Sequence, residues 1–384
     1  MIIRQATSRL KKLAKQFKIV AVTGPRQSGK TTLVKTTFPK KPYVSLENID
    51  NRELAQKDPR GFLNNYPKGA IIDEAQRVPD LFSYLQEIVD VKNTSGQFIL
   101  TGSNNFLLQE NIKQSLAGRV AYLHLLPLSL QELKNSDLLY IDYKKHILQG
   151  FYPEVIKKKI NAADWYENYL NTYIEKDVRQ LKNITNIATF SKFIRLCASR
   201  CGNVVNMSEL ANACGVDQKT INSWISVLQS SYIIFLLQPH YNNLNKRIIK
   251  APKLYFYDVG LAAYLCGIFD SNSLNYSSFK GHLFENMMII EKKKQILNIN
   301  TREELYFWRD KTGHEIDLLI EYGNTLSLVE FKSSETFSTS DFNTIYFYKN
   351  LNTSVLNSYV YYGGKQNLKI NTATFLKSWH NLYN

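Results

Sequence analysis

The chain has 384 residues, 44% of them hydrophobic and 21% charged, and a formal net charge of +15 at pH 7. This composition is ordinary for a soluble globular protein, and the length allows about two or three domains with cores of their own. No stretch approaches the roughly 18–20 uncharged apolar residues of a membrane-spanning helix, so we do not expect the chain to cross a membrane.

The N-terminus and the cysteines favour a cytoplasmic protein. The chain opens Met-Ile-Ile-Arg and continues into basic residues, without the apolar segment and cleavage site of a secretory signal. The four cysteines form no Cys-x-x-Cys pair and have no histidine at ligand spacing. We therefore expect reduced thiols and neither a disulfide nor a cysteine-bound metal.

The positive charge has two explanations, which the sequence leaves open. A basic excess attracts polyanions such as nucleic acid. Alternatively, it reflects a general enrichment in Lys, Asn, Ile and Tyr, because the lysines are scattered and form no long basic block.

The first third of the chain alternates between helical and strand-like patterns. A basic helix is predicted over residues 4–17, and another helix starts near Lys30. Short apolar strands are predicted at residues 19–23, 43–46, 70–72, 98–100 and 120–126. This alternation predicts a parallel sheet covered by helices on both faces.

A glycine-rich motif lies between the first strand and the second helix. Gly24, Gly29, Lys30 and Thr31 fit the pattern G-x-x-x-x-G-K-[ST] of a phosphate-binding P-loop. Backbone N–H groups would hold the phosphates of ATP, Lys30 would reach the β- and γ-phosphates, and Thr31 would bind Mg²⁺. The predicted nucleotide-binding residues are Gly24, Pro25, Arg26, Gln27, Ser28, Gly29, Lys30, Thr31, Thr32, Asp73 and Ser103.

The apolar strand at residues 70–72 ends in two acids, Asp73 and Glu74. We expect Asp73 to join Thr31 as a ligand of Mg²⁺ and Glu74 to act as the catalytic residue that polarises the attacking water. The acid pair favours hydrolysis over phosphoryl transfer to an acceptor substrate.

Two further features could complete this site. The polar run at residues 101–105, which includes Ser103, would sense the γ-phosphate or position water, or it forms a plain polar turn. Arg119 is a candidate catalytic arginine finger, acting across a subunit boundary in a homo-oligomer, or else a surface arginine.

Four segments together resemble a known family. They are Thr-Gly-Pro-Arg-Gln-Ser-Gly-Lys-Thr-Thr-Leu (23–33), Ile-Asp-Glu-Ala-Gln (72–76), Leu-Thr-Gly-Ser (100–103) and Leu-Ala-Gly-Arg (116–119). They are similar to a family of prokaryotic AAA-type ATPases that carry a C-terminal domain of unknown function. The resemblance covers nearly the whole chain and implies an ATPase core with Lys30, Asp73 and Glu74 in the usual roles.

The middle of the chain, residues 128–237, is mostly helical. Residues 207–214, a turn at 215–217 and residues 219–229 predict a helix–turn–helix, and a strand at 231–237 would follow as in a winged helix. The second helix offers few side chains for base contacts, namely Gln218, Lys219, Asn222 and Ser223. Sequence reading of DNA and a role as a lid or protein contact therefore both stay open.

A hairpin is predicted further on, with Gly323-Asn324 as a two-residue loop. In that register Asp317 lies opposite Glu330, and Glu315 opposite Lys332, all on one face. Two carboxylates that close repel unless a cation or proton lies between them. Mg²⁺ or Mn²⁺ bound by Asp317 and Glu330 would remove the repulsion, with Lys332 beside a water or a scissile phosphate.

The spacing Asp317…Glu330-x-Lys332 resembles the core of the PD-(D/E)xK nucleases of the restriction-endonuclease-like superfamily. The resemblance implies a catalytic Lys332 and a further metal ligand from a preceding helix, for which Glu285 is in the right order along the chain. Two alternatives stay open. Glu315 and Lys332 form a structural ion pair, or a nuclease fold without activity serves as a binding surface.

We therefore expect an α/β protein of three domains. These are an AAA-type P-loop NTPase core with a parallel sheet (residues 1–130), a helical and winged-helix domain (131–245), and a nuclease-like α/β domain (246–384). The expected function is ATP hydrolysis coupled to binding of nucleic acid, with DNA as the expected partner, or to metal-dependent DNA cleavage. The alternative is an ATP-gated switch or scaffold whose nuclease-like domain binds nucleic acid or protein without cleaving.

Overall fold

The structure is a computed structural model and describes residues 2–92, 94–102, 116–173, 184, 186–240, 251–352 and 354–382. Its contacts divide the chain into two compact units. We call the first the P-loop unit, made of Met1–Leu128, Ser230–Tyr232 and Leu297–Asn300. The second unit consists of Ser129–Gln229, Ile233–Ile296 and Thr301–Asn384.

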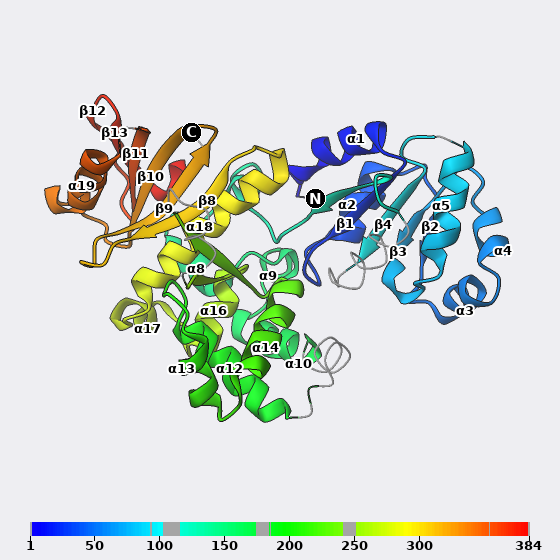
Figure 1. Ribbon diagram of the computed structural model, residues 1–384, viewed down its shortest axis with the longest axis horizontal. Coiled ribbons are helices and arrows are strands. Elements are labelled where there is room, and N and C mark those ends of the chain that lie inside the picture. The colour runs from blue at the N-terminus through cyan, green and yellow to red at the C-terminus, as the bar shows by residue number, and fades with distance from the viewer. Residues whose placement is uncertain are drawn as a thin grey trace. The chain divides into compact units, whose positions relative to one another are not determined.

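The P-loop unit is built on a five-stranded parallel sheet with the strand order β2-β3-β4-β1-β5 (Figure 1). Its strands are β1 (Ile19–Thr23), β2 (Tyr43–Ser45), β3 (Ile71–Asp73), β4 (Phe98–Gly102) and β5 (Val120–His124). Its helices are α1 (Ala6–Gln16), α2 (Lys30–Thr37), α3 (Ile49–Lys57), α4 (Pro59–Asn64), η1 (Ala75–Arg77) and α5 (Leu81–Lys92). The predicted order of elements and the predicted fold class are confirmed.

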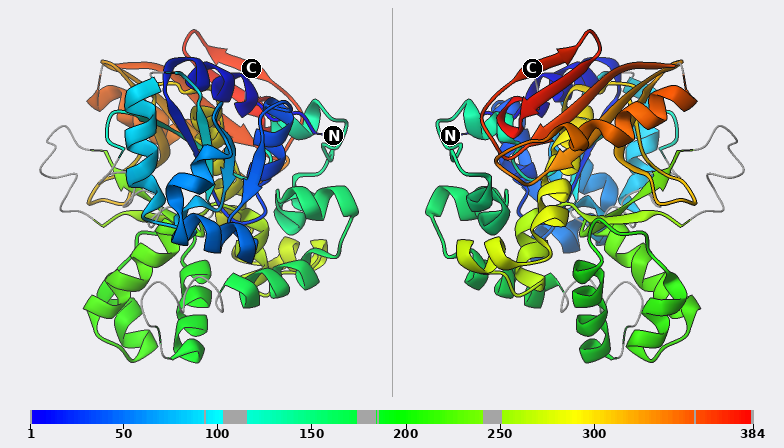
Figure 2. Two further views of the ribbon diagram at one scale, coloured as in Figure 1. Left: turned by 90° about the vertical axis from the view of Figure 1, so that its right-hand side faces the viewer. Right: turned by 90° about the vertical axis from the view of Figure 1, so that its left-hand side faces the viewer.

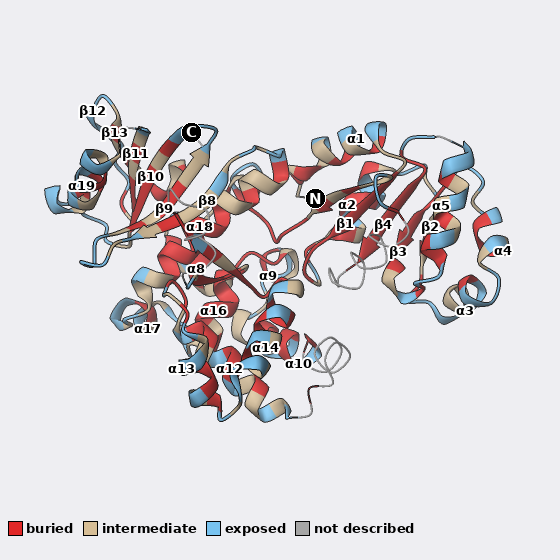
Figure 3. Ribbon diagram, viewed as in Figure 1, coloured by how far each residue is buried: buried red, intermediate tan, exposed pale blue. Residues whose placement is uncertain are grey.

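The central strand β1 explains why this sheet is covered on both faces. All five of its residues are buried (Figure 3). Ile19 and Ala21 belong to the apolar core that includes α5, whereas Val20 and Val22 belong to the core that includes α1 and α2. Strand side chains alternate between the two faces, so an uninterrupted apolar strand requires a helical layer on each side.

The carboxyl ends of β1 and β3 position the candidate nucleotide site. The P-loop follows Thr23 at the end of β1, and Asp73 ends β3. Because parallel strands end at the same edge of a sheet, the loop and the acid meet there although about 40 residues separate them along the chain.

The second unit combines a helical part with an eight-stranded mixed sheet in the order β12-β13-β11-β10-β9-β8-β6-β7. Its helices are α7 (Leu130–Lys134), α8 (Tyr143–Gln149), α9 (Pro153–Lys158), α10 (Ala162–Tyr173), α12 (Ile187–Ser199), α13 (Met207–Cys214), α14 (Gln218–Ser230), α16 (Val259–Leu265), α17 (Ser271–Tyr276), α18 (Lys280–Ile299), η3 (Thr339–Phe342), α19 (Asn343–Leu351) and η4 (Trp379–Asn381). Its strands are β6 (Ile234–Pro239), β7 (Lys253–Phe256), β8 (Glu304–Arg309), β9 (Glu315–Tyr322), β10 (Thr325–Lys332), β11 (Val355–Tyr362), β12 (Leu368–Asn371) and β13 (Thr374–Ser378).

The helices of the predicted helix–turn–helix are present. Helices α12, α13 and α14 lie side by side (Figures 1 and 2). Helix α13 ends at Gly215, whose left-handed backbone (φ 70°) allows the chain to turn into α14. The apolar stripe of α14 is buried as predicted, with Ile221, Trp224, Ile225 and Leu228 at 6% exposure or less.

The predicted hairpin near the C-terminus is also present. Strands β9 and β10 pair antiparallel around the two-residue turn at Gly323-Asn324, in the predicted register from Tyr322–Thr325 to Leu318–Val329. Among the described residues, no helix is both long and apolar enough to cross a membrane.

Candidate functional site

The P-loop geometry requires glycine at two positions. Gly24 has φ 150°, and a Cβ there would lie 2.1 Å from the carbonyl oxygen of Leu125, just beyond β5. Gly29 begins helix α2 from a left-handed conformation with φ 92°. Both glycines let the backbone curl tightly, so that N–H groups at the N-terminus of α2 can bind an anion.

Gly24→Ala should therefore damage the loop. The added methyl would collide with backbone, which has little freedom to move, and Ala would be strained at this φ. We expect a loss of stability of about 2 kcal/mol or more and weaker ATP binding. Thermal unfolding and ATP titration check this, with Gly118→Ala as the control. A Cβ at Gly118 meets nothing within 4 Å, although φ is also positive there. Equal effects of the two substitutions would contradict the packing argument.

Lys30 lies in the P-loop itself. Its ammonium donates to the carbonyls of Gly24 (3.0 Å) and Pro25 (2.8 Å), and the residue is 6% exposed. The lysine is thus held directly over the loop that would contain the phosphates.

The carboxylate of Asp73 accepts hydrogen bonds from three hydroxyl groups. Thr31 donates at 3.0 Å, Tyr43 donates at 2.7 Å, and the Thr101 hydroxyl is in still closer contact. Burial and the neighbouring charge of Asp73 raise the pKa of Tyr43, so its phenol keeps the proton that it donates. The hydroxyl of Thr31 and the carboxylate of Asp73 are the hard oxygen ligands that Mg²⁺ prefers, and they already touch each other.

Glu74 has an unusual backbone. It adopts a left-handed conformation (φ 56°, ψ 44°), which directs the chain from β3 into η1. The side-chain amide of Gln76 donates to its carboxylate at 2.5 Å. Left-handed non-glycine residues are uncommon and concentrate at functional sites.

Arg4 supports the P-loop and was not identified from the sequence. The residue is 9% exposed, and its guanidinium donates to the carbonyls of Ser28 (2.7 Å) and Leu126 (2.6 Å). A buried arginine holding one carbonyl of the loop fixes its curvature and adds positive charge near the phosphates. Its position 20 residues before the motif gave no sequence signal.

The other predicted residues of this site lie as follows. Arg119 makes a two-bond ion pair with Asp90 of α5, at 2.6 and 2.7 Å. Gln27 is exposed with a left-handed φ of 59°, Ser28 is buried, and Thr32 is exposed. Ser103 lies outside the described residues.

In the second unit, the β-hairpin ladder ends one pair before the predicted acid pair. It stops at Leu318 and Val329, and the Asp317 carboxylate instead accepts from the backbone N–H of Phe331 at 2.9 Å. The ladder thus follows the predicted register as far as Leu318 and Val329, where a side-chain bond replaces the next rung, and the direct opposition of Asp317 and Glu330 stays a prediction.

The ion pairs at this end of the hairpin also differ from the prediction. Lys332 pairs with Glu330 on its own strand at 3.2 Å. Glu315 pairs with Arg309 at 3.6 Å and, more closely, with Lys253. The alternative of a cross-strand pair between Glu315 and Lys332 is thus replaced by these contacts.

Lys253, on β7, is the central cation of the cluster and was missed by sequence reasoning. It is 2% exposed, lies 3.1 Å from Glu285 and pairs with Glu315. The hydroxyl of Tyr255 donates to the same oxygen of Glu285. We call Lys253, Glu285, Glu315, Asp317, Glu330 and Lys332 the carboxylate–lysine cluster.

The electrostatics of the carboxylate–lysine cluster reflect its burial. Burial alone would lower the pKa of Lys253, but the charges of Glu285, Asp317 and Glu315 outweigh it and raise the pKa. Burial, followed by the charge of Asp317, raises the pKa of Glu285 to about 7. The same two causes raise the pKa of Glu330, one of whose carboxylate oxygens is buried without a hydrogen-bond partner.

The metal site predicted from Glu285, Asp317 and Glu330 stays a prediction. Across the described ranges, which include Glu285, Asp317 and Glu330, no group of three or more His, Cys, Asp or Glu side chains is placed to hold a metal ion. Lys253 supplies a positive charge beside Glu285, one of the predicted metal ligands.

Lys253→Met should strongly destabilise the second unit. It leaves the buried Glu285 without its lysine partner, a type of loss that costs about 3–5 kcal/mol. A carboxyl group whose pKa is raised by folding binds its proton more tightly in the folded state, so stability falls as pH rises towards 7 and above. Thermal melts of the variant should therefore show a larger deficit at pH 8 than at pH 5.

A second substitution makes this test specific. Adding Glu285→Gln to Lys253→Met removes one of the stranded charges and should restore part of the stability. A deficit that neither depends on pH nor responds to Glu285→Gln would mean that Lys253 contributes through packing alone.

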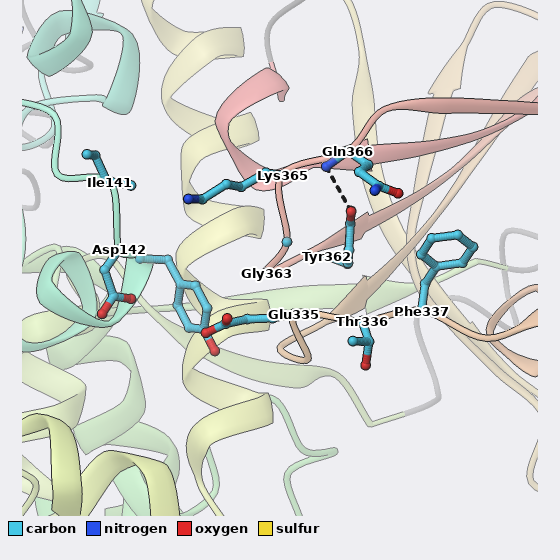
Figure 4. A pocket seen from close by; sticks show the side chains of 11 residues that line it. Ile141, Asp142, Glu335, Thr336, Phe337, Tyr362, Gly363, Lys365 and Gln366 are labelled. Atoms are coloured by element: carbon cyan, nitrogen blue, oxygen red, sulfur yellow. Dashed lines mark hydrogen bonds between the residues drawn. The ribbon is translucent and has the colours of Figure 1, made fainter.

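A pocket of about 680 Å³ lies elsewhere in the second unit, past the carboxyl ends of β10 and β11 (Figure 4). Tyr143, Glu335, Phe337, Tyr362 and Lys365 are among the residues lining it. The backbone N–H of Gln366 donates to the hydroxyl of Tyr362 at 2.9 Å, as Figure 4 shows. The lining comes from three distant segments, which is why the sequence did not indicate this pocket.

Comparisons with known proteins agree with the geometry of the P-loop unit. Residues 16–134 match a family model described as an AAA domain. Residues 140–272 and 280–381 match two domains of unknown function, DUF8612 and DUF4143. The AAA-type P-loop domain predicted from the sequence is thus confirmed, whereas the match to DUF4143 gives no evidence of a PD-(D/E)xK nuclease.

The chain also resembles individual proteins. It is 31% identical over 344 residues to the uncharacterized protein Rv2008c of Mycobacterium tuberculosis, covering 88% of this chain and 75% of that protein. It is 25% identical over 354 residues to the uncharacterized protein MJ1544 of Methanocaldococcus jannaschii, covering 82% and 74%. Among solved structures, the Walker-type ATPase PABY2304 of Pyrococcus abyssi matches with 14% identity and a TM-score of 0.47, over 69% of this chain and 96% of that one.

Proposed function

We propose that this chain, which belongs to the same family as the uncharacterized protein Rv2008c and matches an AAA domain over residues 16–134, hydrolyses ATP at the P-loop and uses ATP to switch a DNA-binding second unit. One observation carries the proposal. The Thr31 hydroxyl and the Asp73 carboxylate are in contact beside Lys30, at the edge of the sheet where the P-loop begins. These are the groups that bind Mg²⁺ and the terminal phosphates of a nucleotide.

Each residue of the P-loop site would have its own role in ATP hydrolysis. Backbone N–H groups of residues 24 and 26–30 and the Lys30 ammonium would hold the phosphates. Thr31 and Asp73 would hold Mg²⁺, which when bound offsets negative charge on the β- and γ-phosphates. The Glu74 carboxylate would orient a water and draw on its proton as the oxygen attacks the γ-phosphorus, while the bond to the ADP oxygen breaks.

Arg119 fits this scheme as a finger only if it changes partner. In the structure its guanidinium is held by Asp90. We propose that it acts on the nucleotide of a neighbouring copy in a homo-oligomer, after release from Asp90.

The DNA-binding part of the proposal rests on charge and on the helix–turn–helix. The chain carries a net charge of +15, and Gln218, Lys219 and Asn222 of α14 are exposed. The order α12, a bridged segment (Cys201–Leu254 and Val204–Lys253), α13, α14, β6 and β7 is the order of elements in a winged helix. These features support DNA over a protein partner.

DNA binding can be tested by fluorescence anisotropy of a labelled duplex at 50 and 200 mM salt, with and without ATP. We expect affinity to fall at least about tenfold over this range, because phosphate contacts release counterions. The double variant Lys219→Ala/Asn222→Ala should bind more weakly, and Lys157→Ala, which removes an exposed lysine of α9, should not. Affinity that is indifferent to salt would contradict a DNA partner.

Metal-dependent DNA cleavage is the second candidate function. The unpartnered buried oxygen of Glu330 favours it, since such an oxygen suits a bound cation. Lys253 weighs against it, because this lysine already pairs with Glu285 and Glu315. We therefore rank binding without cleavage first.

Plasmid DNA incubated with Mg²⁺ or Mn²⁺, with and without ATP, decides between the two. The proposed switch leaves the plasmid intact under every condition. Nicking that disappears in Asp317→Ala, but persists in Glu304→Ala with its exposed carboxylate on β8, would establish the nuclease and overturn our ranking.

A further inference from the structure

A short stretch of chain after helix α14 belongs to the P-loop unit. Helix α14 up to Gln229 and the chain from Ile233 onward belong to the second unit, whereas Ser230–Tyr232 belongs by its contacts to the P-loop unit. Tyr232 is the buried residue of this stretch, with 5% exposure. The chain thus enters the P-loop unit at the end of α14 and leaves it before β6.

The backbone of Tyr232 is in a conformation that favours glycine. Its φ is 58°, and the N–H of Ile233 donates to the carbonyl of Leu228 at 2.9 Å. This bond and the left-handed residue before it are the features of a Schellman motif, the common way to end a helix. A tyrosine at the left-handed position is disfavoured by its Cβ.

Two other helices of the second unit end in the same way with glycine. The N–H of Val216 donates to Ala211 after α13, where the left-handed residue is Gly215. The N–H of Ile268 donates to Ala263 after α16, where it is Gly267. The tyrosine after α14 is therefore not needed for the turn, and its side chain must supply the reason for its presence.

The tyrosine hydroxyl contacts the residue that precedes the P-loop. It is 2.8 Å from the Thr23 hydroxyl and 2.8 Å from Nδ1 of His124, and these two atoms are 2.8 Å from each other. Thr23 is the residue before Gly24 and is completely buried. Its carbonyl accepts from the N–H of Leu125, whose own carbonyl is the one that Gly24 approaches.

We propose that Tyr232 is a positioning residue that couples the nucleotide state of the P-loop to helix α14. The inference rests on the proposed ATP site and names how that site is linked to the second unit. Phosphate binding requires the loop after Thr23 to close around an anion, and any shift of Thr23 must move or break its bonds to Tyr232 and His124. Tyr232 passes such a shift on through the chain itself, because α14 ends at Ser230 and β6 begins at Ile234.

The coupling has a functional consequence for the proposed switch. Helix α14 carries the exposed Gln218, Lys219 and Asn222, and β6 pairs with β7 and β8 in the eight-stranded sheet. A strained tyrosine is a suitable connector, because a left-handed residue that is held by side-chain bonds tends to relax when those bonds are lost.

The distribution of tryptophans allows a direct test. The four tryptophans of the chain are Trp165, Trp224, Trp308 and Trp379, and all of them belong to the second unit, with Trp224 on α14 itself. Tryptophan fluorescence therefore reports on the second unit, whereas ATP binds in the P-loop unit. Calorimetry measures ATP binding independently of this signal.

The decisive variant is Tyr232→Phe, which keeps the ring and removes the hydroxyl. We expect wild type to change its tryptophan fluorescence on ATP binding, and the variant to lose this change while its ATP affinity stays within about threefold. Its kcat should fall about threefold to tenfold with little change in KM, the size expected for one neutral hydrogen bond. Hydrogen exchange of residues 218–230 should likewise respond to ATP in wild type and not in the variant.

Two further variants keep the test decisive. Tyr122→Phe removes a buried hydroxyl without a hydrogen-bond partner on β5, two residues from His124, and should leave the response intact. Thr23→Val removes the second hydroxyl of the triangle with little change in shape, and should reproduce the loss if Tyr232→Phe proves unstable. An ATP response retained in both Tyr232→Phe and Thr23→Val, or absent from a wild type that binds ATP, overturns the coupling. Wild type that binds no ATP overturns the proposed ATP site instead.

Discussion

Lys30→Ala is expected to reduce ATP turnover roughly 10²–10³-fold, the loss typical of removing one preorganised group that stabilises transition-state charge. Lys30 is 6% exposed and bound to the carbonyls of Gly24 and Pro25, so its ammonium is held where the terminal phosphates would lie. Those carbonyls can exchange the ammonium for water, so the fold should survive. Phosphate release and thermal unfolding measure the two effects separately.

Lys40→Ala is the matched control, because Lys40 is an exposed lysine just beyond α2. It should keep wild-type turnover. The melting temperature of Lys30→Ala should stay within about 4 °C of wild type, or roughly 1 kcal/mol. Unchanged turnover in a folded Lys30→Ala protein would refute the site.

Glu74→Gln is expected to separate ATP binding from hydrolysis. The amide has nearly the shape of the carboxylate but cannot take a share of the water's proton, and such general-base contributions are about 10²–10⁴-fold. We expect turnover to fall by at least about a hundredfold while ATP affinity stays near that of wild type. Calorimetric ATP titration, combined with single-turnover hydrolysis, checks both statements.

The control for this experiment is Glu87→Gln, which alters an exposed acid of α5 that pairs with Arg60. It should hydrolyse ATP normally. If Glu74→Gln hydrolyses ATP at the wild-type rate, another group activates the water. If it loses binding as well, Glu74 has a structural role through its contact with Gln76.

The P-loop unit could be predicted in detail because its signals are local. Gly24, Gly29, Lys30 and Thr31 lie within eight consecutive residues. Each strand of the sheet can be recognised from a short run of apolar residues. The meeting of Thr31 with Asp73 also followed from the sequence, because carboxyl ends of parallel strands share one edge. Tyr43 did not, since it reaches Asp73 from the amino end of β2 through its length.

The carboxylate–lysine cluster shows the limit of sequence reasoning for a pair of strands. The hairpin register was correct, and it identified a concentration of acids that needed a cation. The cation, however, is contributed by Lys253, 62 residues before Glu315 and on the far edge of the sheet. No periodicity or spacing in the hairpin could indicate it, and only the sheet order β9-β8-β6-β7 brings that part of the chain near.

Arg4 and Tyr232 were missed for a related reason. Each supports the P-loop from a distant segment, and neither residue type forms part of a recognisable motif. In the sequence, a tyrosine at the end of an amphipathic helix cannot be told from an ordinary apolar residue. It has the left-handed backbone that Gly215 and Gly267 have at equivalent turns, and this conformation is visible only in three dimensions.

The most direct test of the account is phosphate release from ATP by the full chain, measured with Mg²⁺ and again with EDTA. We expect turnover that requires Mg²⁺ and that Asp73→Asn reduces strongly, because Asp73 and Thr31, which are in contact, are the proposed ligands of the ion. Hydrolysis that persists in EDTA or in Asp73→Asn, or its complete absence from folded wild-type protein that also fails to bind ATP, would contradict it.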